Sequence, residues 1–276
     1  MSAARQGPAQ RRAALRALGA LLGWVIGPVA WAQGGPAVGP TDLRALVARS
    51  KASVLPVGTF SPTDSPRFGF RGSGFVLAGA GGASSRLVAT NFHVLPEGAE
   101  DSSSVRMAVW VGGSESPPWR LARVVATDRF RDLALLEVEG APMAGLSLAA
   151  DDTVQEGQAI ALMGFPVGSV LGYSVVTHRG IVSSITSAAL PAATARQLDP
   201  RALSRLRDGN FKLLQLDATA YPGNSGGPVF DVESGLVVGV LSSGMVKAGR
   251  ESALSSPTGI TYAVPVAPLR ALLLAR

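Results

Sequence analysis

Residues 219–229 read TAYPGNSGGPV and place one serine, Ser225, inside a run of glycine and proline. Glycine tolerates positive φ angles and close approach of other backbone, so this run predicts a tight turn that displays Ser225 with its amide hydrogens bare. An apolar pair, Val229 and Phe230, follows at once and indicates a strand that returns to a core. A serine in such a turn is either an ordinary loop residue or a nucleophile, and only the rest of the chain distinguishes the two.

Short apolar or alternating runs recur through the chain of 276 residues, separated by glycine, proline, serine and acidic clusters. This pattern is typical of β-strands. The runs form two groups of six, with a break near residues 140–157. We therefore predict an all-β fold of two antiparallel six-stranded β-barrels, a form that closes its sheet edges. The expected bounds are about 52–140 for barrel one and about 145–266 for barrel two.

Two short helices are expected at the ends of this fold. Thr41 and Asp42 provide capping side chains for a helix in the stretch DLRALVARSKA. Helical spacing near the carboxyl end predicts a second helix at about 267–276, docked on barrel two. Between the strands, residues 188–210 are polar and rich in arginine, with a short helix expected from Pro200. This segment is interpreted as a solvated surface loop, or alternatively as a border of a substrate cleft.

The first 32 residues have the layout of a secretory signal peptide. Four arginines and no acid precede an uncharged apolar run that ends in the A-x-A pattern Ala30-Trp31-Ala32. We expect cleavage after Ala32, a flexible lead over residues 33–41, and a periplasmic or secreted mature chain without stable membrane insertion. The alternative is an uncleaved membrane anchor. Without the four arginines the net charge falls from +6 to +2, so composition gives no case for nucleic-acid binding.

A serine hydroxyl becomes a nucleophile only when a base takes its proton, and the base is most often histidine. The chain has two histidines. His93 lies where an apolar strand meets a turn, which predicts a position at the rim of barrel one. His178 lies in an alternating run, as an exposed structural strand residue would. Asp132 leads a buried-looking strand and is the candidate partner of the histidine, whereas Asp128 falls in the preceding turn, where aspartate is common.

The order of these residues along the chain separates the remaining possibilities. The sequence GNSGG fits the nucleophile elbow of α/β-hydrolases, but in that fold the histidine follows the serine, and here none does. A subtilisin-like order needs an aspartate ahead of His93, and the aspartates there lie in cap and turn contexts. The trio His93, Asp132 and Ser225 survives, at the crevice between the barrels. With no cysteine and two histidines, no metal site and no cofactor is expected.

Five segments carry a resemblance to a known family: GSGFV, VATNFHVL, DLALLEV, LQLDATAYPGNSGGPVFD and GITYAVPV. From Asp42 to Arg276 the chain resembles a chymotrypsin-fold serine protease, in particular the HtrA/Deg branch of exported bacterial proteases. The resemblance implies an endopeptidase domain over residues 42–276, acting in protein quality control through an acyl-enzyme, with His93 as base, Asp132 as its orienting carboxylate and Ser225 as nucleophile.

The resemblance also implies further roles around the serine. The amides of Gly223 and Ser225 would stabilise the oxyanion, with Asn224 setting their turn. Thr219, six residues before Ser225, would lie at the base of the primary specificity pocket and favour small or medium aliphatic side chains. An edge formed by Leu241, Ser242, Ser243 and Gly244 would pair with the backbone of unfolded polypeptide substrates as an added strand.

Three departures from the family pattern bear on regulation. Asn224 replaces the aspartate of digestive members, so activation by terminal cleavage is not expected. Arg131 precedes Asp132 where a small hydroxyl residue is frequent, and the chain ends soon after GITYAVPV, where many HtrA proteins continue into PDZ domains. The alternative functions are a catalytically silent binder or chaperone of unfolded chains with the same fold, and a membrane-anchored structural domain.

Overall fold

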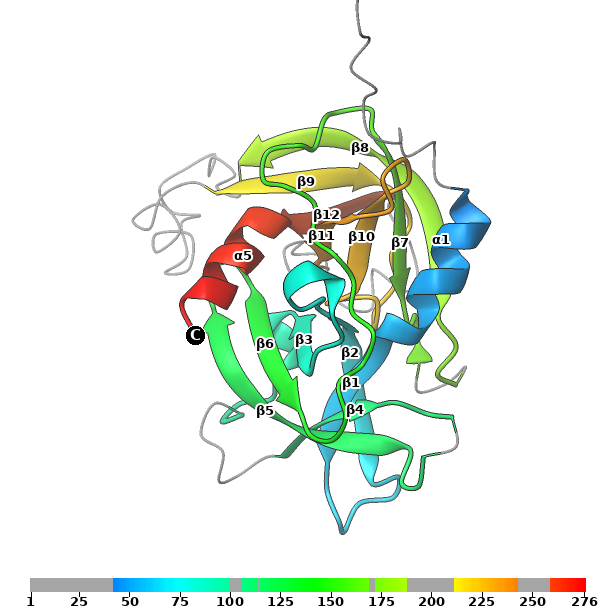
Figure 1. Cartoon of the computed structure of the whole chain (residues 1–276), viewed down its shortest axis with the longest axis vertical. Coiled ribbons are helices and arrows are strands. Elements are labelled where there is room, and N and C mark those ends of the chain that lie inside the picture. Colours follow the sequence, from blue (N-terminus) through cyan, green and yellow to red (C-terminus); the bar gives the residue numbers. More distant parts are fainter. Residues whose placement is uncertain (1–41, 100–105, 114, 169–171, 188–210, 243–258) are drawn as a thin grey trace, which may run out of the picture. The chain divides into compact units, whose positions relative to one another are not determined.

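The computed structural model describes residues 42–99, 106–113, 115–168, 172–187, 211–242 and 259–276 (Figure 1). Several predictions fall outside these ranges: the signal peptide over residues 1–32, the lead over residues 33–41, and the arginine-rich segment 188–210. Ser243 and Gly244 also lie outside the described residues.

Barrel one consists of six antiparallel strands in the closed order β1-β2-β3-β6-β5-β4. Their bounds are β1 Val54–Phe60, β2 Phe68–Val76, β3 Leu87–Thr90, β4 Arg106–Trp110, β5 Trp119–Asp128 and β6 Leu133–Val138. Barrel two closes in the order β10-β11-β12-β9-β8-β7. Its strands are β7 Ala159–Gly164, β8 Val176–Ser187, β9 Lys212–Asp217, β10 Pro228–Asp231, β11 Val237–Leu241 and β12 Ile260–Pro265. The predicted fold class is confirmed.

Strand β6 begins with four consecutive apolar residues, and its position between the two barrels explains this sequence. Successive side chains of a strand point to opposite faces. Leu136 and its alternate neighbours belong to the core inside barrel one. Leu133 and Leu135 join a second cluster, which also contains Phe230 and Val240 of barrel two. Over Leu133–Leu136 both faces of β6 are therefore buried, one inside its own barrel and one against the neighbouring barrel.

Helices lie at both ends of the described chain. Helix α1, Leu43–Ser50, begins after Asp42, whose side chain accepts a hydrogen bond from the amide of Arg44, as the capping prediction requires. Helix α5, Val266–Leu274, begins one residue earlier than predicted. It contacts β11 and β12 but also β5 and β6, so it bridges both barrels and does not dock on barrel two alone (Figure 1). Short 3₁₀ helices are η1 Lys51–Ser53, η2 Ala80–Gly82 and η3 Phe92–Val94.

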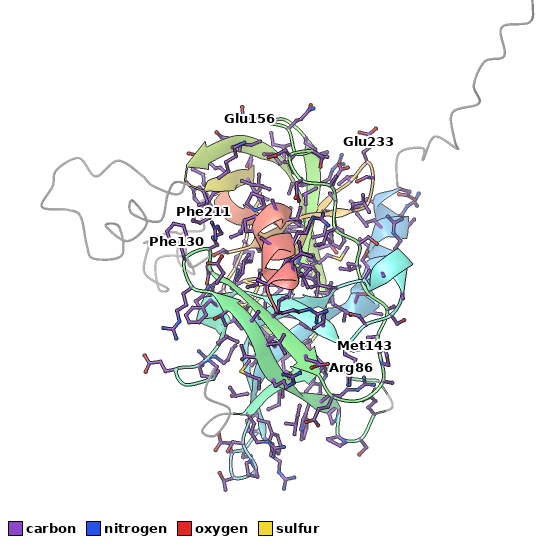
Figure 2. All side chains as sticks on the ribbon, turned by 60° about the vertical axis from the view of Figure 1, so that its left-hand side comes forward. Arg86, Phe130, Met143, Glu156, Phe211 and Glu233 are labelled. Atoms are coloured by element: carbon purple, nitrogen blue, oxygen red, sulfur yellow. The ribbon has the colours of Figure 1, made fainter. Side chains whose placement is uncertain are left out.

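Side chains also join the barrels away from α5. Phe130, in the turn before β6, packs edge-on against Phe211, next to the start of β9, with 5.2 Å between the ring centroids (Figure 2). This contact and the shared apolar cluster fix the strand ends of barrel one against those of barrel two. In the ranges that the structure describes, no helix has both the length and the apolar character needed to span a membrane.

Candidate active site

Strand pairing brings His93 and Asp132 together. Strands β3 and β6 are antiparallel neighbours, with Thr90 opposite Ala134, so the residues that follow β3 lie beside those that precede β6. His93 lies in η3, just after β3, and Asp132 lies directly before β6. The Nδ1 atom of His93 is 2.8 Å from Oδ2 of Asp132. An ionised carboxylate only accepts hydrogen bonds, so Nδ1 carries the proton and Nε2 of a neutral ring is an acceptor.

The backbone around Asp132 fixes its carboxylate relative to the imidazole. Asp132 adopts φ 57°, a left-handed conformation that costs energy in residues other than glycine and is tolerated best by aspartate and asparagine. The Asn91 side-chain amide donates to the Asp132 carbonyl at 2.9 Å. The His93 backbone amide donates to Oδ1 at 2.9 Å while its ring binds Oδ2. The carboxylate therefore holds both the backbone and the ring of His93.

Ser242 supplies a third hydrogen bond to this carboxylate. Its hydroxyl donates to Oδ2 of Asp132 at 2.6 Å, from the residue that follows β11 of barrel two. Ser242 is fully buried, and its amide donates to the Tyr262 carbonyl. Its side chain therefore supports Asp132. The sequence did not indicate this contact, because chain position alone does not show that barrel two reaches over the strand ends of barrel one. The pairing of the Ser242 backbone with substrate stays a prediction.

The alternative carboxylate, Asp128, has a different partner. Its Oδ1 accepts the Arg131 backbone amide at 2.9 Å, and its Oδ2 accepts the Arg131 guanidinium at 2.8 Å. The guanidinium also lies over the Phe130 ring, 5.6 Å from its centroid. Arg131, which stands where a small hydroxyl residue is frequent in the family, is therefore bonded to Asp128.

Ser225 lies in the turn before β10 and is 3% exposed. Its carbonyl accepts the amide of Ser73, from β2 of barrel one, at 2.8 Å. The next residue, Gly226, donates its amide to the Leu241 carbonyl at 2.8 Å. Leu241 directly precedes the serine that binds Asp132. The turn with the candidate nucleophile is thus bonded on one side to barrel one and on the other to the strand end that supports the carboxylate.

The residues before the serine form a closely packed turn. Gly223 adopts φ 99°, and a Cβ at this position would lie 2.4 Å from the Phe165 carbonyl oxygen, so a larger residue does not fit. Among the described residues, the Gly223 amide has no hydrogen-bond acceptor. Asn224 is fully buried, and its backbone bonds to Tyr221 and Gly227. Neither polar atom of the Asn224 side chain has a partner within the described chain.

The predictions for the substrate-binding residues have different outcomes. Thr219 is half-buried, two residues after β9. Leu241 was predicted to belong to an open edge, and this is wrong: it is fully buried, its amide donates to Gly227 and its carbonyl accepts Gly226. The turn that follows Ser225 covers this strand, so Leu241 offers no free backbone group. The part of the prediction on Ser243 and Gly244 lies outside the described residues.

His178 is not the exposed strand residue that its sequence context predicts. It pairs with Leu162, whose side chain belongs to the core inside barrel two, and directly paired residues share a face of the sheet. Its ring lies 6.0 Å from that of Tyr221, and its Nε2 atom is buried without a partner in the described ranges. Burial lowers the pKa of this imidazole. His178 is therefore a neutral, half-buried side chain near the turn of the nucleophile.

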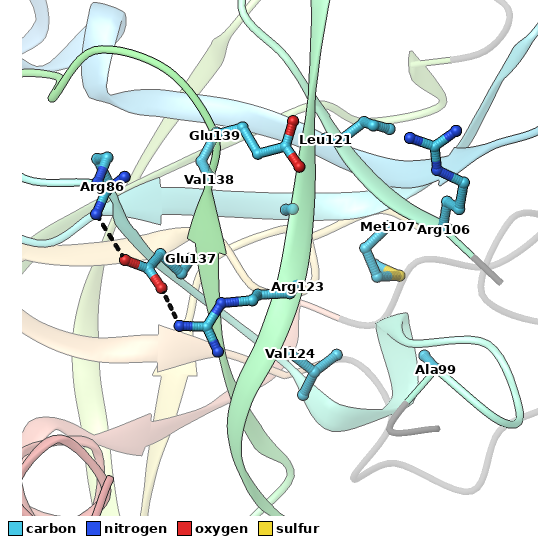
Figure 3. Close-up of a pocket in the computed structure, with 11 residues that line it drawn as sticks. Arg86, Ala99, Arg106, Met107, Leu121, Arg123, Val124, Glu137, Val138 and Glu139 are labelled. Atoms are coloured by element: carbon cyan, nitrogen blue, oxygen red, sulfur yellow. Dashed lines mark hydrogen bonds and ion pairs between the residues drawn. The ribbon is translucent and has the colours of Figure 1, made fainter. Parts of the chain in front are cut away.

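Other polar clusters do not contain the predicted site residues. In the described part of the chain, no group of three or more His, Cys, Asp or Glu side chains is placed to hold a metal ion. A pocket on barrel one contains a charged cluster, in which Glu137 binds both Arg86 and Arg123 (Figure 3). The pocket is lined from β4, β5 and β6 and by Arg86 and Ala99, and includes neither His93 nor Asp132.

The two closed barrels, with a histidine, an aspartate and a serine brought to their junction, define the chymotrypsin-like class of fold. Residues 72–240 match the family model described as "Trypsin-like peptidase domain". This match covers more than half of the sequence, and the chain belongs to the family of trypsin-like peptidases.

Similar proteins place the chain near the HtrA branch. It is 30% identical over 210 residues to the "Probable periplasmic serine endoprotease DegP-like" of Marinomonas sp. (strain MWYL1), covering 76% of this chain and 36% of the relative. It is 29% identical over 209 residues to the "Serine protease Do-like HtrA" of Lactococcus lactis subsp. lactis (strain IL1403), covering 75% and 45%. The chain thus spans less than half the length of these relatives, and the resemblance to HtrA proteases is confirmed.

The crystal structure of Deg5 has the same fold. It superposes with a TM-score of 0.55 at 22% sequence identity, covering 81% of this chain and 88% of Deg5. At this identity the likeness supports the double-barrel fold and says nothing about individual side chains.

Proposed function

We propose that this chain is a serine endopeptidase that hydrolyses peptide bonds through His93, Asp132 and Ser225. The observation that carries the proposal is the bond of 2.8 Å between Nδ1 of His93 and Oδ2 of Asp132. Because this bond places the ring proton on Nδ1, it leaves Nε2 as the basic atom of the side chain. The His93 side chain is 33% exposed, so the base reaches the surface while its carboxylate partner is only 13% exposed.

The proposed reaction proceeds in two steps through an acyl-enzyme. Oγ of Ser225 attacks the carbonyl carbon of the scissile peptide while its proton passes to Nε2 of His93. The tetrahedral intermediate then collapses: the C–N bond breaks, and His93 returns the proton to the departing amine. Water repeats the sequence on the ester, so that its proton passes to His93 and then to Oγ of Ser225. Asp132 stabilises the imidazolium formed in each half and remains ionised.

The negative oxygen of each intermediate requires donors that are in place before the reaction. We assign this role to the amides of Gly223 and Ser225. Support comes from φ 99° at Gly223 and from the space there, which the Phe165 carbonyl limits to a residue without a side chain. Asn224 sets the turn between the two donors, through its backbone bonds to Tyr221 and Gly227.

The substrate proposed is an unfolded or damaged polypeptide with a small or medium aliphatic side chain before the scissile bond. A neutral Thr219 at the base of the primary pocket does not attract lysine or arginine. Since Leu241 is covered, the proposed pairing of substrate as an added strand is confined to Ser242–Gly244. The HtrA relatives are named as serine proteases or endoproteases, which is consistent with a polypeptide substrate.

Export and domain organisation complete the proposal. The name of the Marinomonas relative describes that protein as periplasmic. Together with the basic head and the A-x-A pattern of residues 1–32, this supports an exported chain that is cleaved after Ala32. Residues 42–276 then form one trypsin-like serine protease domain.

Degradation of an unfolded protein tests the proposal. Purified mature chain is incubated with reduced, alkylated casein, and new peptide termini are identified by mass spectrometry, alongside Ser225→Ala. We expect casein peptides from the wild type and none from the variant, with both chains melting at similar temperatures. Binding of casein by both chains without any new termini would instead establish a catalytically silent binder.

A further inference from the structure

Ser73 connects barrel one to the turn that precedes the nucleophile. It lies in β2 and is fully buried. Its hydroxyl donates to the Gly223 carbonyl at 2.7 Å and accepts the Phe165 amide at 3.0 Å. Because the Phe165 amide fills an acceptor position of the hydroxyl, the hydroxyl proton is directed to Gly223. A buried hydroxyl with both partners satisfied adopts one orientation.

The backbone of Ser73 binds the same turn at one more point and also binds β3 of barrel one. Its amide donates to the Ser225 carbonyl at 2.8 Å, and its own carbonyl accepts the Thr90 hydroxyl at 2.7 Å. A Cβ at Gly226 would lie 2.1 Å from the Ser73 carbonyl oxygen, so the two segments are in direct contact. The backbone of Ser73 therefore fixes the nucleophile residue, whereas its side chain fixes the peptide group two residues earlier.

This hydroxyl binds the residue that carries one of the two proposed oxyanion donors. The amide and the carbonyl of Gly223 flank one Cα, and a glycine rotates more freely than any other residue. Holding the carbonyl restricts the rotation that would turn the amide away from the substrate oxygen. Oxyanion stabilisation depends on donors that need no reorganisation during the reaction. Since Ser73 belongs to barrel one and Gly223 to barrel two, this side chain links barrel one to the residue that carries the amide.

We propose that Ser73 is a positioning residue, whose hydroxyl holds the Gly223 carbonyl and so keeps the turn in the conformation in which the Gly223 amide faces the reaction intermediate. This inference rests on the proposed peptidase function and adds a residue to its site. Ser73 touches neither substrate nor reacting atoms in this account. Its effect is therefore expected on kcat and on the binding of transition-state analogues, and not on KM.

The test compares Ser73→Ala with Ser85→Ala. Ser85 is a matched control, because its hydroxyl also donates to a carbonyl, that of Leu77, and accepts an amide, that of Leu87, on barrel one. Removing a whole oxyanion donor costs about 100- to 1,000-fold in kcat, so a misdirected donor is expected to cost about 10- to 100-fold. For Ser73→Ala we expect that loss with KM within about twofold, and a similar loss of affinity for a peptide boronate. Ser85→Ala should retain both values.

Hydrogen–deuterium exchange of a peptide spanning residues 222–227 provides a readout that does not require activity. We expect faster exchange in Ser73→Ala than in the wild type or in Ser85→Ala. If the wild type neither cleaves peptides nor reacts with a serine-directed probe, but Ser73→Ala still exchanges faster, then the proposed function fails and the contact between Ser73 and the turn is supported. Equal kcat and equal exchange in the two alanine variants would overturn the role of Ser73. If Ser73→Ala does not fold, Ser73→Cys replaces it, because the thiol is similar in size to the hydroxyl but is a weak donor. We expect the same loss of kcat and the same faster exchange for this variant.

Discussion

Replacing Asp132 by asparagine perturbs the proposed site with the smallest change in shape. Oδ1 accepts the His93 backbone amide, so the asparagine oxygen occupies that position and its NH₂ group replaces Oδ2. The NH₂ group then faces Nδ1 of His93, a donor against a donor. The imidazole avoids this conflict when its proton moves to Nε2. In that tautomer Nε2 cannot accept the Ser225 proton. The left-handed backbone at residue 132 suits asparagine, so the variant should fold.

The expected loss follows from this change of tautomer. Where the same substitution has been made in a serine protease triad, kcat falls about 10⁴-fold. At about 1.4 kcal/mol for each factor of ten, this corresponds to about 5 kcal/mol of transition-state stabilisation. We expect Asp132→Asn to lose kcat by about that factor, because the His93 ring, the His93 backbone amide and the Ser242 hydroxyl all bind the carboxylate that the substitution changes.

Asp128→Asn is the matched control for this assay. It makes the same substitution four residues earlier, at a carboxylate that binds Arg131. Initial rates on a chromogenic peptide are measured for wild type and both variants, at equal amounts of folded protein checked by melting temperature. We expect Asp128→Asn to retain its rate within about threefold. A rate for Asp132→Asn within tenfold of wild type, or an equal loss in both variants, would refute the reasoning.

Three further substitutions, the first with a matched control, test other contacts. Gly226→Ala places a Cβ 2.1 Å from the Ser73 carbonyl at φ 86°, and should lower the melting temperature and abolish activity. Gly235→Ala also adds a Cβ at a positive φ, but there the clash is with the flexible end of the Arg49 side chain, so this variant should remain active. Equal losses of activity in the Gly226 and Gly235 variants would contradict this expected difference. Thr219→Asp should raise cleavage after lysine or arginine relative to valine by about tenfold or more, measured on a peptide library. Burial lowers the pKa of His178, so as the pH falls the unfolded protein binds a proton at this residue before the folded protein does, and the folded state loses stability. The melting temperature of His178→Gln should therefore fall less than that of the wild type between about pH 7.5 and 5.5.

The fold could be predicted from the sequence because each strand has a local signal. Apolar runs bounded by glycine and proline mark the twelve described strands in order, and the continuous apolar runs of β7 and of the first four residues of β6 reflect burial of both of their faces. The docking of α5 was predicted less well. Its apolar residues indicate a buried face, but nothing local specifies that this face spans both barrels.

The site could be predicted in part for a related reason. His93 and Asp132 stand at strand ends, and their chain order relative to Ser225 excludes other arrangements. Ser73 gave no such signal, since its partner Gly223 is 150 residues away and a serine in a glycine-rich strand looks ordinary. Leu241 was misassigned because an apolar strand end does not reveal that the turn after Ser225 covers it.

The central claim is that barrel one activates a hydroxyl carried by barrel two. A fluorophosphonate, which reacts only with an activated serine, measures this most directly when the modified residue is mapped by mass spectrometry in wild type and in His93→Ala. We expect one adduct, on Ser225, formed at least about 1,000-fold more slowly in the variant. Labelling at another serine, or labelling of Ser225 at the same rate without the imidazole, would contradict it.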